Sequence, residues 1–379
     1  MNLNIKEGVR RCEWRSCYTS PSYFRINFIS PVAGLFVIFF HPFPKLEFRM
    51  HPTTIIDLLV VILLLPFMVF RALHWILDRG AFKDRSAVKS VDSFYSKFRA
   101  HIKEVLIRPG RCIMLLHIQQ SQPINTRGSI LLIHGSCARM QQFEDQIQFF
   151  VDKGYDVISY DALGCGRSAK PVGPKLYTSS EMYADLQAVL DEYVTKQGIK
   201  AKCIIGHSIG GSMVLKLAAS PQARSITQSV ISLCPPSFTD AGQIEVFKLP
   251  APVLWLIRPF MSVKARELLF GPTATDALKN QEREASARNP VHMFKAFYLG
   301  IDPYVLSPKS FGNRLEVPTL ILAADHDKIC PSESVLGIAE NFTENPPVAE
   351  VIKGFGHQCM QEQPELVNKR LESFLKTFS

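Results

Sequence analysis

Short apolar runs alternate with amphipathic segments from about residue 104 to the C-terminus. Buried strands of a parallel sheet consist of such runs, and helices carry apolar residues three and four positions apart. The alternation predicts an α/β fold, a mostly parallel sheet with helices on both faces. We expect a hairpin over 104–118, strands over 129–133, 155–160, 203–205, 228–234, 319–323 and 348–352, and helices over 141–151, 183–194 and 364–378.

The alternation stops between residues 236 and 315, which divides the predicted core into 104–235 and 316–379. The intervening stretch is rich in Pro, Phe, Leu and Met, and it predicts short helices inserted before the strand at 319. Sites of parallel α/β sheets lie at the carboxyl ends of the strands. We therefore expect a helical lid, or cap, over the site that admits an apolar chain, with ordinary helix packing as the alternative.

An apolar segment upstream of the domain predicts a transmembrane or membrane-anchor helix over 54–78. Its apolar part, residues 55–77, is about 23 residues long, and a helix of that length covers roughly 30 Å. A buried core helix is the alternative, but every residue from Leu58 to Phe70 is apolar or Pro, and such a run is rare in soluble helices. Residues 1–53 show no clear periodicity and are expected to be poorly ordered, and 79–103 reads as a linker. The segment starts too late for a signal peptide, although Met50 is an alternative start.

Composition supports a folded domain beside a membrane. Apolar residues make up 47% of the 379 residues and charged residues 20%, so a large core can form. The net charge of +9 is uneven, because residues 1–111 hold 17 Lys and Arg against 8 Asp and Glu, while the remainder is balanced. A basic excess beside an apolar segment favours anionic lipid headgroups, and the domain has no basic stripe for nucleic acid. The sequence identifies no protein partner.

The nine cysteines are scattered, without a Cys-x-x-Cys pair or a Cys/His cluster of metal spacing. This pattern favours free thiols in a reducing compartment, and we expect no metal and no cofactor. Basic residues after the apolar segment outnumber those before it, which predicts that the domain after the segment lies in the cytosol. Asn341 in the sequon Asn341-Phe342-Thr343 is then expected to be unmodified. Endoplasmic reticulum, lipid droplet and mitochondrial membranes all remain open.

A Gly-x-Ser-x-Gly turn, Gly206-His207-Ser208-Ile209-Gly210, follows the apolar run 203–205 and precedes a helical pattern. A nucleophile elbow needs this strand, sharp turn and helix, because side chains at the two glycine positions would clash. Ser208 is the candidate nucleophile. A glycine-rich turn without chemistry is the alternative.

Serine needs a base, and the base needs a carboxylate that fixes its tautomer. His357 follows a strand and a Gly-Phe-Gly turn and is the candidate base, and Asp325 and Asp327 compete for the carboxylate role. Two backbone N–H groups, from Ile209 and from Ser136, are expected to form the oxyanion hole. Ser136, Ser208, Asp327 and His357 each follow a predicted strand, so we expect them to meet at one edge of the sheet.

Five motifs over about residues 104–379 resemble the α/β-hydrolase fold family, and within it the α/β-hydrolase domain-containing proteins. They are His134-Gly135, Asp161-x-x-Gly-x-Gly-x-Ser168, Gly206-His207-Ser208-Ile209-Gly210, Asp327-Lys-Ile-Cys-Pro331, and Gly356-His357 with Glu362-x-Pro364. The fourth motif looks like the acid turn of the family, which favours Asp327 over Asp325. The resemblance implies ester hydrolysis or lysophospholipid acyl transfer on membranes and lipid droplets.

The hypothesis from the sequence is a membrane-associated serine hydrolase that cleaves lipid-like carboxylic esters through an acyl-enzyme. Acyltransferase relatives carry a His-x4-Asp pattern at the catalytic base. In this chain the residue at that spacing from His357 is Glu362, whose side chain is one methylene longer than that of aspartate. Transfer is therefore less supported. A scaffold that lost its nucleophile is a third alternative, which the presence of Ser208 disfavours.

Overall fold

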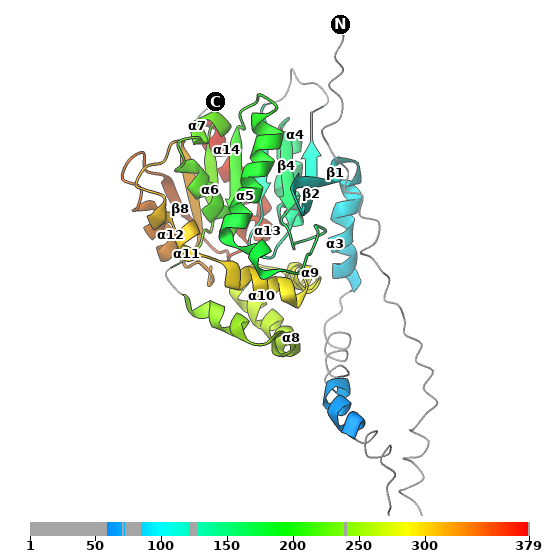
Figure 1. Ribbon diagram of the computed structural model, residues 1–379. Coiled ribbons are helices and arrows are strands. Elements are labelled where there is room, and N and C mark those ends of the chain that lie inside the picture. The colour runs from blue at the N-terminus through cyan, green and yellow to red at the C-terminus, as the bar shows by residue number, and fades with distance from the viewer. Residues whose placement is uncertain (1–58, 70–71, 73–84, 121–126, 239–240, 378–379) are drawn as a thin grey trace, which may run out of the picture. The chain divides into compact units, whose positions relative to one another are not determined.

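A computed structural model describes residues 59–69, 72, 85–120, 127–238 and 241–377 (Figure 1). The chain separates into two units, of which one contains Asp78–Ser379 and the other spans Glu13–Leu77. The first unit carries the sheet and the helices around it.

One eight-stranded sheet runs through the domain in the order β1-β2-β4-β3-β5-β6-β7-β8. Strand β2 runs antiparallel to both of its neighbours, β1 and β4, and strands β3 to β8 run parallel to one another. This arrangement confirms the predicted α/β class. The predicted hairpin forms with Pro109-Gly110 at its turn, where Gly110 has a φ of 73°. The strands are β1 Ile102–Arg108, β2 Arg111–Ile118, β3 Ser129–Ile133, β4 Asp156–Asp161, β5 Cys203–His207, β6 Val230–Leu233, β7 Thr319–Ala324 and β8 Val348–Ile352.

The sheet is covered on both faces, so its central strands are buried along their whole length. Alternate strand residues enter two separate apolar cores: Leu131 faces one and Leu132 the other. Helices α5 (Ser179–Leu190), α6 (Ile209–Ala218) and α12 (Ser332–Ala339) line the first core. Helices α4 (Glu144–Asp152) and α14 (Pro364–Lys376) line the second. Burial on both faces explains why these strands consist of unbroken apolar runs.

Helix α3 (Arg85–Lys97) lies within the segment predicted as a linker, and it packs on the second core. Phe94 and Tyr95 of this helix and Phe98 just after it are buried. The remaining short helical elements are η1 Arg99–His101, η3 Met140–Phe143, η4 Pro174–Tyr177, the π-helical η5 Asp191–Thr195, α7 Ala223–Ile226, η7 Pro308–Ser310 and α13 Cys359–Glu362.

The insertion predicted over 236–315 is helical. It holds η6 (Ala241–Lys248), α8 (Ala251–Leu269), α9 (Asp276–Ala287), α10 (Val291–Gly300) and α11 (Pro303–Leu306). Helices α8, α9 and α10 lie together below the sheet in Figure 1. Helix α8 is loosely packed, since Leu254 is its one buried residue.

The predicted membrane helix over 54–78 falls largely outside the described residues. Residues 59–69 and 72 are helical, and the apolar side chains of 59–69 are exposed. Within the part of the chain that the structure describes, no helix has both the length and the apolar character needed to cross a membrane.

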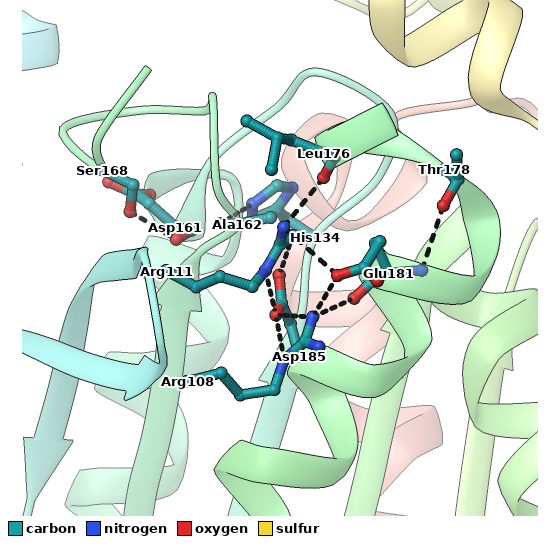
Figure 2. Close-up of polar contacts among 10 residues, drawn as sticks. All are labelled: Arg108, Arg111, His134, Asp161, Ala162, Ser168, Leu176, Thr178, Glu181 and Asp185. Atoms are coloured by element: carbon teal, nitrogen blue, oxygen red, sulfur yellow. Dashed lines mark hydrogen bonds and ion pairs between the residues drawn. The ribbon is translucent and has the colours of Figure 1, made fainter. Parts of the chain in front are cut away.

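A buried cluster of charges ties the β1–β2 hairpin to helix α5 (Figure 2). Arg111 and Asp185 pair with side chains that are each 4% exposed. Arg108 adds contacts to Asp185 at 2.6 Å and to Glu181 at 2.7 Å. Arg111 also donates to the Leu176 carbonyl at 3.0 Å, just before the buried Tyr177. The cluster balances two positive and two negative charges, and its central pair, Arg111 and Asp185, lies away from water, so each of these two buried groups depends on its partners.

Replacing Arg111 by methionine is expected to lower the free energy of unfolding by about 3 kcal/mol, because the buried Asp185 carboxylate would lose one of its two cationic partners. Urea unfolding followed by circular dichroism measures the change. Arg224→Met is the matched control, since that side chain is 59% exposed in its pair with Glu316. It should cost about 0.5 kcal/mol or less. Equal effects of the two substitutions would show that the buried cluster contributes nothing special.

Candidate active site

Ser208 occupies a sharp turn between strand β5 and helix α6, with φ 54° and ψ −121°. This backbone conformation is strained for a residue with a side chain. The turn is tight, because a Cβ atom on Gly206 would lie 2.2 Å from the Gly210 carbonyl oxygen. A Cβ atom on Gly210 would in turn lie 2.6 Å from the Ile133 carbonyl oxygen. The glycines allow the chain to cross itself and hold Ser208 at the tip, as a nucleophile elbow requires.

His357 and Asp327 form a buried pair beside the elbow. His357 Nδ1 lies 2.7 Å from Asp327 Oδ2, and the two residues are 3% and 5% exposed. The other carboxylate oxygen of Asp327 accepts backbone N–H bonds from Ile329 at 2.8 Å and Cys330 at 2.7 Å. These bonds fix the carboxylate, which in turn fixes the orientation of the imidazole.

The competing carboxylate, Asp325, has a different position. Its Oδ1 accepts backbone N–H bonds from Gly354 at 2.7 Å and Phe355 at 3.2 Å. Asp325 therefore orders the turn that leads into His357, while Asp327 contacts the imidazole itself.

The Asp327 carboxylate makes His357 more basic. Burial of the ring is the largest single influence and lowers the pKa of His357, but the charges and hydrogen bonds of Asp327 and Cys330 together raise it by more, so the pKa lies well above its ordinary value. A carboxylate in this position stabilises the imidazolium that forms when a base takes a serine proton. Among the described residues no hydrogen bond joins Ser208 Oγ to His357, and such bonds often form only when substrate binds.

Two backbone N–H groups predicted for the oxyanion hole lie close to Ser208. Ile209 begins helix α6, so its N–H points out of the helix end. The loop that carries Ser136 packs directly on the nucleophile, because a Cβ atom on Gly135 would lie 3.0 Å from Ser208 Cβ. In the part of the chain that the structure describes, neither N–H has a protein acceptor. Both donors are available for a developing negative charge.

The two other motif residues, His134 and Asp161, have structural roles (Figure 2). His134 Nε2 accepts the Ala162 N–H at 2.9 Å, so its Nδ1–H donates to the Gly135 carbonyl at 2.7 Å. Asp161 is fully buried, and it accepts bonds from the Tyr95 hydroxyl at 2.7 Å and from the Arg167 N–H at 2.8 Å. Asp161 thus orders the turn that follows it and anchors helix α3.

A buried amide links three loops of the site and was not predicted from the sequence. Gln142 Oε1 accepts the Gly135 N–H at 3.2 Å, and Gln142 Nε2 lies 2.5 Å from His207 Nδ1. His207 Nε2 in turn lies 2.8 Å from the His357 carbonyl oxygen. That carbonyl can only accept, so His207 carries its proton on Nε2 and accepts from Gln142 on Nδ1. Burial, and then the charge of His357, hold the pKa of His207 well below its usual value, which keeps the ring neutral.

Replacing Gln142 by leucine should lower kcat for ester hydrolysis by up to about 100-fold, because the oxyanion loop and the elbow lose their common partner. Gln146→Leu is the control. Gln146 is equally buried, but it donates to the Met360 carbonyl and the Asn368 side chain rather than to the oxyanion loop or the elbow. It should lower stability without lowering kcat. Steady-state kinetics of both variants with a p-nitrophenyl ester measure kcat. Equal kcat values for the two variants would show that Gln142 does not contribute to the site.

The insertion reaches the same loops through buried polar contacts. Arg139, two residues after Cys137, pairs with Glu282 of helix α9 at 3.0 Å. Asn289, which follows α9, donates to the Cys137 carbonyl at 2.6 Å. Met293 of α10 packs on the turn at Gly164, where a Cβ atom would meet it at 2.6 Å. The insertion therefore forms part of the surroundings of the site.

The chain is similar to known proteins along most of the domain. A protein-family model described as serine aminopeptidase, S33 matches residues 124–364. The Protein ABHD8 of Mus musculus is 26% identical over 276 residues, which cover 71% of this chain and 61% of that protein. The chain thus spans about three-fifths of that curated relative.

Solved structures show the same fold. The esterase EaEST from Exiguobacterium antarcticum superposes with a TM-score of 0.58 at 21% identity, covering 70% of this chain and 96% of the esterase. The esterase RhEst1 from Rhodococcus sp. gives a TM-score of 0.60 at 17% identity, with coverage of 74% and 100%. At such identities the likeness concerns the fold alone.

Proposed function

The chain belongs to the serine aminopeptidase S33 family of α/β hydrolases, and on that premise we propose that it is a membrane-associated serine hydrolase of lipid-like carboxylic esters. The observation that carries the proposal is the buried hydrogen bond of 2.7 Å between His357 and Asp327 beside Ser208 in its strained turn.

In the proposed reaction Ser208 Oγ attacks the ester carbonyl carbon while His357 Nε2 takes the hydroxyl proton. The N–H groups of Ser136 and Ile209 stabilise the oxyanion, and Asp327 stabilises the imidazolium through Nδ1–H. The proton on Nε2 then passes to the leaving alcohol, and an acyl-enzyme remains. Water, activated by His357, releases the acid and restores Ser208.

The lipid-like substrate class and the lid are supported by the apolar surface of the insertion. Phe260 on α8 is 64% exposed, and Val253 on the same helix is 39% exposed. Exposed apolar residues on an insertion that contacts the site suit a long acyl chain or a lipid surface. The basic, apolar N-terminal region supports membrane association with the domain in the cytosol.

Glu362 bears on the choice between hydrolysis and acyl transfer. Its carboxylate accepts N–H bonds from Gly356 at 3.1 Å and from Gly271 at 3.1 Å. Burial raises the pKa of this carboxyl, and the N–H bonds oppose that rise. Because Glu362 is committed to joining the His357 loop to the insertion, hydrolysis is the better-supported reaction.

The cytosolic placement predicts that Asn341 carries no glycan in cells. The Asn341 amide donates to the carbonyl oxygens of Gly337 at 3.2 Å and Ile338 at 3.0 Å, and so closes the end of helix α12. A glycan would take one amide hydrogen and disturb this cap. Electrophoresis with and without endoglycosidase, beside an Asn341→Gln control, should show one mobility. A shift that depends on Asn341 would place the domain in the lumen.

The substrate class is tested by turnover of p-nitrophenyl esters of increasing acyl length, monoacylglycerols and lysophospholipids by the full chain in detergent micelles. Ser208-dependent hydrolysis that increases with acyl length is expected. Preference for short acyl chains would refute lipid-like substrates while leaving the esterase assignment intact. Turnover of peptides but no ester would refute the ester class.

A further inference from the structure

Three buried thiols surround the His357–Asp327 pair. Cys234 follows β6, Cys330 lies in the turn after Asp327, and Cys359 lies two residues after His357. The thiol of Cys330 interacts with the His357 ring. The Sγ atoms of Cys234 and Cys359 are 4.0 Å apart. Scattered in the sequence, these cysteines meet because β6, β7 and β8 are neighbours in the sheet.

One ligand atom from each of Cys234, Asp327 and His357 lies within 4.8 Å of the other two. Within the described ranges no other group of three His, Cys or carboxylate side chains is close enough to share a metal ion. We propose that these three side chains bind Zn²⁺ and that the ion inhibits the hydrolase. The inhibition rests on the proposed function, whereas the binding does not.

The ligands suit zinc in type, geometry and charge. Zinc binds thiolate sulfur at about 2.3 Å and imidazole nitrogen or carboxylate oxygen at about 2.0–2.2 Å, in tetrahedral sites whose ligand atoms are about 3.3–3.8 Å apart. The present ligand atoms already lie within 4.8 Å of one another, and water or the Cys359 thiol, 4.0 Å from that of Cys234, can fill the fourth position. One thiolate, one carboxylate and a neutral imidazole cancel the charge of the ion, so the buried site remains neutral.

Zinc binding at this place removes the catalytic base. The proton on His357 Nδ1 points to Asp327, and Nε2 is free to accept the proton of Ser208. When zinc occupies Nδ1, that imidazole proton moves to Nε2, and the proton of the Cys234 thiol is released to solvent. The imidazole can then no longer accept from Ser208, and its hydrogen bond to Asp327 is lost. No oxidation or reduction is involved.

Binding is measured without any need for activity. Reduced Ser208→Ala protein is titrated with Cd²⁺, whose thiolate complexes absorb in the ultraviolet, and then with competing Zn²⁺. One equivalent of ion should bind, with an affinity that falls about tenfold or more in a Cys234→Ser background. The control is Cys203→Ser, because Cys203 is a buried thiol at the start of β5 outside the cluster, and its affinity should not change. Equal binding by the Cys234 and control variants, or no binding by any protein, overturns the site.

Inhibition is measured as the rate of fluorophosphonate labelling with and without Zn²⁺, each protein being compared with itself. Zinc should slow labelling of the otherwise unchanged chain at least tenfold, EDTA should reverse the effect, and Mg²⁺ should have none. The Cys234→Ser protein should lose the zinc effect, and Cys234→Ala provides a second variant if serine disturbs folding. Cd²⁺ binding without slowed labelling overturns the inhibition. If the chain is never labelled, the proposed function fails and the cadmium titration still decides the site.

Discussion

Replacing Ser208 by alanine is expected to lower kcat for ester hydrolysis by about 10⁴-fold or more. The methyl group leaves no atom to form the acyl-enzyme, and the remaining oxyanion donors give only a small residual rate. The fold should persist, because the Ser208 hydroxyl makes no hydrogen bond in the described part of the chain that alanine would break. Hydrolysis of a p-nitrophenyl ester by purified proteins measures the effect.

Ser212→Ala is the matched control for this experiment. Ser212 lies one turn later on helix α6, is fully buried and has no hydrogen-bond partner for its hydroxyl. Loss of this hydroxyl should leave kcat within about threefold, because no hydrogen bond is broken and no group that acts in the transition state is removed. A Ser208→Ala protein as active as the Ser212→Ala control would end the serine hydrolase account.

Replacing Asp327 by asparagine is expected to lower kcat by about 10³- to 10⁴-fold with little loss of stability. An amide can donate to His357 Nδ1, which favours the tautomer with its proton on Nε2. That imidazole cannot accept from Ser208, and the amide cannot stabilise the imidazolium. The pH dependence of kcat should also change, because His357 no longer has a negatively charged partner that stabilises its protonated form.

Asp325→Asn separates the two carboxylates that the sequence left in competition. The Asp325 side chain accepts two backbone N–H bonds, and an amide oxygen can still accept both. The expected loss is below about tenfold. A larger loss for Asp325→Asn than for Asp327→Asn would assign the orienting role to Asp325 and contradict the geometry of the His357–Asp327 pair.

The fold was largely predictable because burial on both faces of a sheet leaves a plain signal. Strand β7 was expected over 319–323 and found at Thr319–Ala324, and β8 was expected and found over 348–352. Helix α5 was expected over 183–194 and found at Ser179–Leu190, followed by a π-helical turn to Thr195. Helix α3 was missed, because its charged residues resemble a linker and its apolar residues become significant only against the sheet.

The sequence indicated candidate site residues only where a reactive side chain follows a strand. Ser208, Asp327 and His357 could be named from their motifs, and parallel strands bring such residues to one edge. The contact of Gln142 with His207 joins residues 65 positions apart, and no local pattern distinguishes this glutamine from its neighbours. The thiol of Cys234 lies 125 positions from that of Cys359, so the cluster around His357 exists only in the folded sheet.

The central claim is that Ser208 is a nucleophile activated by His357. Its most direct test is reaction of the folded full chain with a fluorophosphonate, followed by digestion and mass spectrometry of the modified peptide. The account predicts one adduct, on Ser208, whose formation is about 10³-fold slower in Asp327→Asn and at normal rate in Asp325→Asn. A folded protein that stays unlabelled beside a reactive control hydrolase, or an adduct on any other residue, would contradict it.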